Sequence, residues 1–229
     1  MPSIDLPAGP IDYTDTGGDG PVLVFGHGLL MNETQWRAVI PLLTGFRCIA
    51  PTWPLGAHRR PMKPDADLSQ AGVANVIADF LEALDLDEVT LVLNDWGGGQ
   101  FIVSEERDHR LGRLVLASCE AFDNFPPKPA RPASALCRVP VRRDLAKFAT
   151  GAPSKTVLRA WHDDVVCFDR PVLLLWAVED TMMPIGHARR MVGEFPNARL
   201  VEVADSWTLL PEDQPERVAA ELADFVRTT

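Results

Sequence analysis

The sequence predicts an α/β protein with a mostly parallel central sheet flanked by helices, formed as one domain. Short apolar runs, typical of buried strands, alternate along the chain with longer stretches in which apolar residues recur at helical spacing. A chain of 229 residues is long enough for a domain with a sizeable core. No internal repeat interrupts the alternation, so we expect residues 1–229 to form a single unit.

The expected elements follow one another as βαβ units require. Two early strands, joined by a glycine-rich turn, precede a first helix and a short third strand. A long amphipathic helix then leads to a buried strand and the helix after it, followed by three more strands and a closing amphipathic helix. In order, the expected ranges are 11–16, 21–25, 35–43, 47–50, 68–84, 89–93, 97–107, 114–117, 172–177, 200–203 and 216–226.

One stretch breaks the alternation after the strand expected at 114–117. Five prolines fall within fifteen residues, so we expect an extended, irregular segment there. Two short helical stretches are predicted to follow it, at 142–149 and 155–161. The prolines of this segment are Pro126, Pro127, Pro129, Pro132 and Pro140.

The charge balance argues against nucleic acid and anionic membranes as partners. The chain carries 22 basic and 32 acidic residues, a net charge of −10, without a large basic cluster. No apolar run approaches the roughly 20 residues of a membrane span, and the first residues do not resemble a signal peptide. We therefore expect a cytoplasmic protein that binds a small-molecule substrate; its oligomeric state stays open. Its cysteines lack CxxC spacing and are expected to be reduced: Cys48, Cys119, Cys137 and Cys167.

The most informative motif is Asn94-Asp95-Trp96-Gly97, directly after the apolar run at 89–93. A strand that turns sharply into a helix exposes one side chain and leaves space only for small neighbours. The motif resembles the nucleophile elbow of α/β-hydrolases, in particular the apolar-His-Asp-Trp-Gly pattern of haloalkane dehalogenases and epoxide hydrolases. The resemblance covers about residues 11–226 and implies the α/β-hydrolase fold with Asp95 as nucleophile. The alternative is that Asp95 only caps the next helix.

A second motif, His27-Gly28, follows the strand expected at 21–25 and resembles the family's oxyanion motif. The resemblance implies that the backbone N–H groups of Leu29 and Trp96 hold negative charge opposite the nucleophile. In this setting His27 is expected to be structural.

The family inserts a cap over the active site after the strand expected here at 114–117. Residues 120–170 must supply it, which makes the cap shorter than is usual in dehalogenase-like relatives. By resemblance, Trp96 binds a leaving halide through its indole N–H, and Trp161 of the cap is a candidate partner; both can instead be packing residues. Epoxide hydrolases use two cap tyrosines. The only tyrosine here is Tyr13, in the first strand, so epoxide opening by that mechanism is excluded.

The resemblance assigns the acid of the catalytic triad to Asp180, after the strand expected at 172–177. Glu120 is the alternative position, used by one dehalogenase branch. The family's histidine lies seven residues before a proline, but counting back from Pro215 reaches Thr208. Thr208 is therefore expected to line the substrate site in the space of the missing base. Without a base, an ester on Asp95 can form but cannot be hydrolysed.

His58 is the candidate replacement base, because its loop follows the strand expected at 47–50 and borders the pocket. The alternative is a loop histidine bonded to the backbone. The remaining histidines are favoured less: His109 as a surface residue, His187 as structural and His162 as a cap residue that could point either way.

These observations together predict a dehalogenase-like hydrolase acting on a small, largely apolar substrate through Asp95, with Asp180 and His58 assisting. No metal or cofactor is expected, since no His/Asp/Cys cluster has ligand spacing. Two alternatives stay open, because this fold hosts many functions. One is a lyase, isomerase or cyclase that uses Asp95 as a general base, and the other is a degenerate relative that only binds a ligand.

Overall fold

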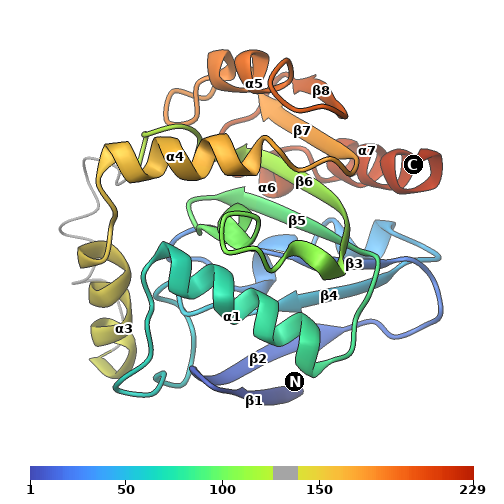
Figure 1. Cartoon of the computed structure of the whole chain (residues 1–229). Helices are drawn as coiled ribbons and strands as arrows, with labels where there is room; N and C mark the ends of the chain where they lie inside the picture. The colour runs from blue at the N-terminus through green and yellow to red at the C-terminus, as the bar shows by residue number, and fades with distance from the viewer. Residues whose placement is uncertain (126–138) are drawn as a thin grey trace.

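The computed structural model describes residues 1–125 and 139–229, and confirms the expected α/β class. In this part of the chain an eight-stranded sheet has the order β1-β2-β4-β3-β5-β6-β7-β8 (Figure 1). β1 and β2 pair antiparallel, and β2 pairs antiparallel with β4; all other neighbours are parallel. The strands are β1 (Ser3–Leu6), β2 (Gly9–Asp15), β3 (Val22–Phe25), β4 (Arg47–Pro51), β5 (Val89–Asp95), β6 (Leu111–Cys119), β7 (Val172–Ala177) and β8 (Ala198–Val203).

Helices cover the sheet and enclose two apolar cores, one on each face (Figure 1). On one face α1 contributes Val73, Ile77 and Phe80, and on the other α7 contributes Leu222 and Phe225. Burial of such side chains on both faces is what parallel sheets require. The helices are α1 (Gln70–Ala83), α3 (Val139–Thr150), α4 (Lys155–Val165), α5 (Ile185–Met191), α6 (Leu210–Asp213) and α7 (Pro215–Thr228).

The strand β5 lies near the middle of the sheet and every one of its residues is buried. Its side chains alternate between the two cores: Leu91 and Leu93 join one, and Val92 joins the other. Asp95 is the last residue of this buried central strand, so the packing of β5 on both faces holds its backbone in place.

Two helices expected from the sequence are short 3₁₀ turns instead. The range 35–43 contains two of them, Glu33–Trp36 and Ile40–Leu42, because Pro41 cannot continue a regular α-helix. The range 97–107 contains Gly99–Ile102, which begins after Gly98 in the left-handed conformation with φ 69°. Three consecutive glycines disfavour a longer helix there. The sequence reasoning also missed β1 and α6, which are both only four residues long.

The chain between β6 and β7 forms α3 and α4 at the places where two short helices were expected. Most of the predicted proline-rich segment, with Cys137, lies outside the described residues, whereas Pro140 lies within α3. Val141 and Leu145 of α3 pack against Leu29 and Leu30, which follow β3. The α3 helix therefore lies over the carboxyl end of β3.

Candidate active site

As predicted, Asp95 ends a central strand on a strained turn. Its φ of 64° lies in the left-handed region, which non-glycine residues adopt only at an energetic cost. The pairing of β5 with β6 shifts register between Asn94 and Asp95, so the strand ends in an irregularity at this residue. The side chain is nevertheless buried, with the residue 8% exposed.

The two oxygens of the Asp95 carboxyl group have different surroundings. Oδ2 accepts a hydrogen bond from the backbone N–H of Leu29 at 3.0 Å, and the N–H of Trp96 also hydrogen-bonds the group. The sequence suggested the same two N–H groups as an oxyanion hole, and that role stays a prediction. Oδ1 is buried and has no hydrogen-bond partner among the described residues. The arrangement holds one oxygen in place and leaves the other free.

Close approach of the backbone makes Gly28 necessary for this arrangement. A Cβ atom on Gly28 would lie 2.3 Å from Asp95 Oδ2 and 2.7 Å from its Cβ. Since real Cβ atoms do not approach other atoms so closely, a larger residue would force the carboxyl group away from the Leu29 N–H.

Burial raises the pKa of Asp95 to about 7. The hydrogen bonds from Leu29 and Trp96 oppose this shift, and the charges of Glu120 and Asp180 add to it. A carboxyl group with this pKa is only partly ionised at neutral pH.

Asn94, at the position where the related motif has histidine, ties the turn to the loop that contains Thr208. Its Nδ2 donates to the carbonyl oxygens of Ala117 at 2.5 Å and Thr208 at 2.6 Å. Its Oδ1 accepts from Gln35 Nε2, while Gln35 Oε1 accepts from Gly28 N at 2.8 Å. Thr208 is buried, and its backbone carbonyl is bound to the residue before Asp95. Its expected position in the space of the missing base stays a prediction.

The two candidate acids differ in what their oxygens bind. Asp180 lies shortly after β7 and its Oδ1 accepts from the N–H groups of Met182 at 2.8 Å and Met183 at 2.9 Å. Its Oδ2 is buried without a partner among the described residues. Glu120, by contrast, has both carboxyl oxygens in hydrogen bonds. Only Asp180 offers a free buried oxygen near Asp95.

The imidazole ring of His27 is structural, as expected. Its Nδ1 donates to the Gly28 carbonyl at 2.9 Å, and its Nε2 accepts from the N–H of Trp53 at 2.8 Å. Burial lowers its pKa to about 4, so the ring stays neutral while it joins the loops after β3 and β4.

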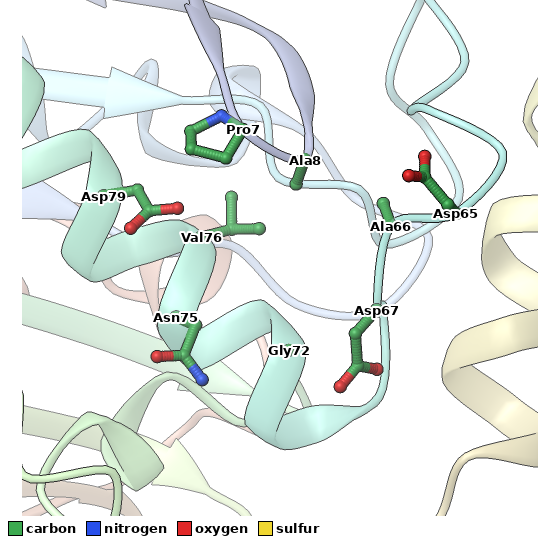
Figure 2. Close-up of a pocket in the computed structure, with 9 residues that line it drawn as sticks. All are labelled: Pro7, Ala8, Asp65, Ala66, Asp67, Gly72, Asn75, Val76 and Asp79. Atoms are coloured by element: carbon green, nitrogen blue, oxygen red, sulfur yellow. The ribbon is translucent and has the colours of Figure 1, made fainter.

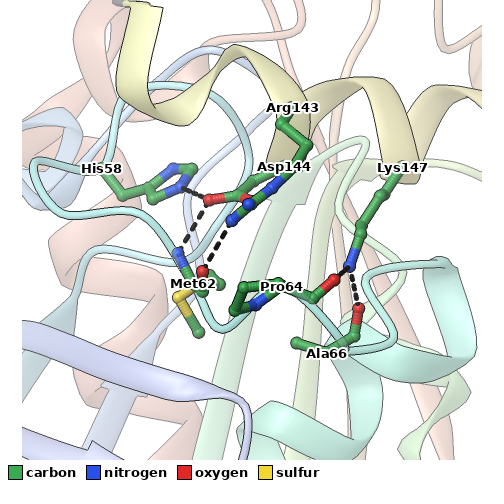
Figure 3. A network of polar contacts seen from close by, with 7 residues as sticks. All are labelled: His58, Met62, Pro64, Ala66, Arg143, Asp144 and Lys147. Atoms are coloured by element: carbon green, nitrogen blue, oxygen red, sulfur yellow. Dashed lines mark hydrogen bonds and ion pairs between the residues drawn. The ribbon is translucent and has the colours of Figure 1, made fainter.

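The geometry does not bring His58 to Asp95. Its Nε2 lies 3.1 Å from Asp144 Oδ2 of α3, and the same oxygen accepts from Met62 N at 2.8 Å (Figure 3). Its Nδ1 is buried without a partner among the described residues, and burial lowers the His58 pKa. His58 therefore links the loop after β4 to α3, and this contact gives no support to its expected role as replacement base.

The other histidines also contact groups away from Asp95. His162 Nε2 lies 2.9 Å from Glu194 Oε2, and both His162 and His187 pack against the ring of Phe122. His109 is exposed, as expected. Within the described ranges, no histidine is seen in contact with Asp95.

The two tryptophans expected to bind substrate have different environments. The Trp96 side chain is 5% exposed, and its indole N–H has no hydrogen-bond acceptor among residues 1–125 and 139–229. Trp161 packs against Phe101, with ring centroids 5.0 Å apart. Trp96 thus keeps a free buried donor next to Asp95 in the chain, whereas Trp161 has the surroundings of a packing residue.

Sequence reasoning missed the buried glutamines around the turn, which are Gln35, Gln70 and Gln100. Gln100 lines a cavity of about 10 Å³ beside Asp95, with room for about one water molecule.

A larger hollow of about 280 Å³ lies elsewhere, between α1 and the segment 65–67 (Figure 2). Asp65, Asp67 and Asp79 line it, but Asp67 already accepts from Ser69 N and Asp79 pairs with Arg107. Over the described ranges no group of three or more ligating side chains could hold a metal ion. None of the predicted site residues lines this hollow.

Comparisons with known proteins agree with the fold. The model of the alpha/beta hydrolase fold family matches residues 21–130. The haloalkane dehalogenase 2 of Mycobacterium tuberculosis is 26% identical over 267 residues, which span 96% of this chain and 92% of the relative.

Two solved structures have the same fold. The haloalkane dehalogenase DbeA of Bradyrhizobium elkani superposes with a TM-score of 0.77 at 15% identity, covering 99% of this chain and 97% of the other. A thermophilic esterase of Thermogutta terrifontis gives 0.78 at 19% identity, covering 100% and 99%. The chain has the α/β-hydrolase fold, and the model of that family matches just under half of its residues. Its sequence is distantly related to haloalkane dehalogenases.

Proposed function

We propose that this protein is a dehalogenase-like hydrolase in which Asp95 attacks a small, largely apolar alkyl substrate that carries a halide leaving group. The observation that carries the proposal is the asymmetry of the Asp95 carboxyl group, with Oδ2 held by Leu29 N–H and Oδ1 buried and free. The names of the related dehalogenases support the choice of leaving group.

In the first step, an electron pair of Oδ1 forms a bond to the substrate carbon as the carbon–halogen bond breaks. The halogen leaves with the bonding electrons as halide, and the product on the protein is an Asp95 alkyl ester. The unpartnered indole N–H of Trp96 is a suitable donor to the departing anion. Since only the ionised carboxylate attacks, the pKa of about 7 makes this step faster as the pH rises.

The second step, hydrolysis of the ester, is expected to be slow. It needs a base to activate water, and a threonine hydroxyl at position 208 cannot serve as one. Asp180 keeps a free buried oxygen that can orient a water molecule, but no histidine among the described residues contacts Asp95 to act as the base. We therefore expect the ester to accumulate.

Halide release measured against protein concentration tests this proposal. A short 1-bromoalkane at pH 8 should release a burst of about one bromide per protein molecule, followed by a slow steady rate. The burst should be absent in Asp95→Asn, which keeps the shape of the side chain, and unchanged in Asp123→Asn, whose carboxyl group pairs with Arg159 outside the site. A wild-type protein that releases no bromide, or an Asp95→Asn variant that still gives the burst, would contradict the proposal.

A second function, in which Asp95 is a general base, is favoured by its pKa of about 7, because a base works best with a pKa near the working pH. Turnover in ¹⁸O-labelled water separates the two. An Asp95 ester that is hydrolysed leaves ¹⁸O in the Asp95 carboxyl group, whereas a general base leaves that group unlabelled.

A further inference from the structure

Glu120 sits directly behind the Asp95 turn and is almost fully buried, at 3% exposure. It follows the last residue of β6, and its backbone N–H donates to the carbonyl of Asp95 at 3.3 Å. Its carboxyl Oε1 accepts from Gly97 N at 3.2 Å and also from Gly98 N. Its Oε2 accepts from Gln70 Nε2 at 2.5 Å.

These contacts close the turn that presents Asp95. The N–H groups of Gly97 and Gly98 come just before the 3₁₀ turn Gly99–Ile102 and have no helical partner of their own, so a buried carboxylate there satisfies both. Through Gln70, the same carboxylate ties the turn to the start of α1. A single side chain therefore connects β6, the turn and α1.

The contacts also hold a second ionisable carboxyl group close to Asp95. Burial raises the pKa of Glu120 to about 7, and the charge of Glu120 in turn raises the pKa of Asp95. The charge of Asp180 also raises the pKa of Asp95, and burial, together with the charges of Glu120 and Asp95, raises the pKa of the Cys119 thiol. His162 shares a small cavity with Glu120, but its Nε2 is bound to Glu194.

We propose that Glu120 is a positioning residue, which clamps the Gly97–Gly98 turn and places its own carboxyl group beside Asp95. Ionisation of either group then disfavours ionisation of the other. The role differs from that of a triad acid, which needs an oxygen free to orient a base, because both Glu120 oxygens are already occupied. The inference rests on Asp95 being the reactive group of the proposed function.

The variant Glu120→Gln tests this role without emptying the site. The new amide oxygen can still accept from Gly97 and Gly98. Gln70 Oε1 is buried without a partner among the described residues, so a flip of the Gln70 amide lets it accept from the new amide nitrogen. The variant should therefore fold, and its thermal unfolding midpoint verifies this.

Titration of ¹³C-labelled carboxyl groups by NMR reads Asp95 directly, with its signal assigned from Asp95→Asn. The midpoint should lie near 7 in the wild type and fall in Glu120→Gln, because the amide carries no charge that opposes ionisation of Asp95. Glu194→Gln, a matched change at a residue that pairs with His162 and Arg190, should leave it unchanged.

A folded Glu120→Gln protein with an unchanged Asp95 midpoint would overturn the inference, and so would an equal shift in Glu194→Gln. This readout needs no substrate. If bromoalkanes give no halide burst while the midpoint still shifts, the proposed function fails and the role of Glu120 stands.

Discussion

Replacing Asp95 by Asn should stabilise the protein increasingly as the pH rises, because the native fold holds this carboxyl group in surroundings that disfavour its charge. In the unfolded chain the group ionises near its ordinary pKa of 3.8, whereas in the native state its pKa is about 7. Below pH 3.8 both states are protonated and the group costs nothing. Between pH 4 and 7 only the unfolded state loses the proton, so stability falls, and above pH 7 the loss is complete.

The size of the effect follows from the pKa values. The rise from 3.8 to about 7 corresponds to about 4 kcal/mol of lost stability above pH 7. Asn cannot ionise and so avoids this loss, and it also tolerates the left-handed backbone at this position better than most residues. Its amide nitrogen lacks a partner on the Oδ1 side, which costs about 1–3 kcal/mol at every pH. The net gain at pH 8 is about 1–3 kcal/mol.

Urea unfolding at pH 4, 6 and 8 measures this difference between the two proteins. The stability of Asp95→Asn relative to the wild type should increase by several kcal/mol from pH 4 to pH 8. A stability difference that stays flat with pH, or that falls, would show that the native fold does not raise the pKa of Asp95 and so loses no stability by burying it.

Three further predictions concern residues around the turn. Gly28→Ala should slow the bromide burst about 100-fold or more, because its Cβ would displace the Asp95 carboxyl group from Leu29 N–H. Gly186→Ala is the control, since a Cβ there meets nothing within 4 Å. Equal burst rates in the two variants would count against the prediction. Thr208→His should convert the burst into sustained bromide release, because Asp180 Oδ2 is free to orient the new ring; a burst without turnover would show that the pocket cannot place it. His58→Ala should lower the free energy of unfolding by about 1–3 kcal/mol, because the contact with Asp144 is lost. The rate of the bromide burst should stay unchanged. Loss of the burst in a folded variant would show that His58 belongs to the active site.

Much of the fold could be predicted from the sequence, because apolar runs of strand length and helical periodicity are local signals. The strand 172–177 and the position of Asp95 at a strand end are examples. The predictions of helices at 35–43 and 97–107 were wrong for local reasons as well. Pro41 and the glycines at 97–99 disfavour a regular α-helix more strongly than the apolar pattern favours it.

The polar contacts of the site could not be predicted in the same way. The partner of His58 is Asp144, 86 residues further along the chain, and no motif links the two positions. Glu120 was recognised as a possible acid by its place after a strand, but its actual partners, Gly97, Gly98 and Gln70, depend on how β6 and α1 meet behind the turn. Such pairings belong to the tertiary structure.

The most direct test of the central claim, that Asp95 Oδ1 is the nucleophile, is peptide mapping of the protein after brief exposure to a short 1-bromoalkane across pH 6 to 8. An alkyl mass increase should appear on the peptide that contains Asp95 and form faster with rising pH, around a midpoint near 7. An increase confined to cysteine or histidine peptides, or none on the Asp95 peptide at any pH, would contradict it.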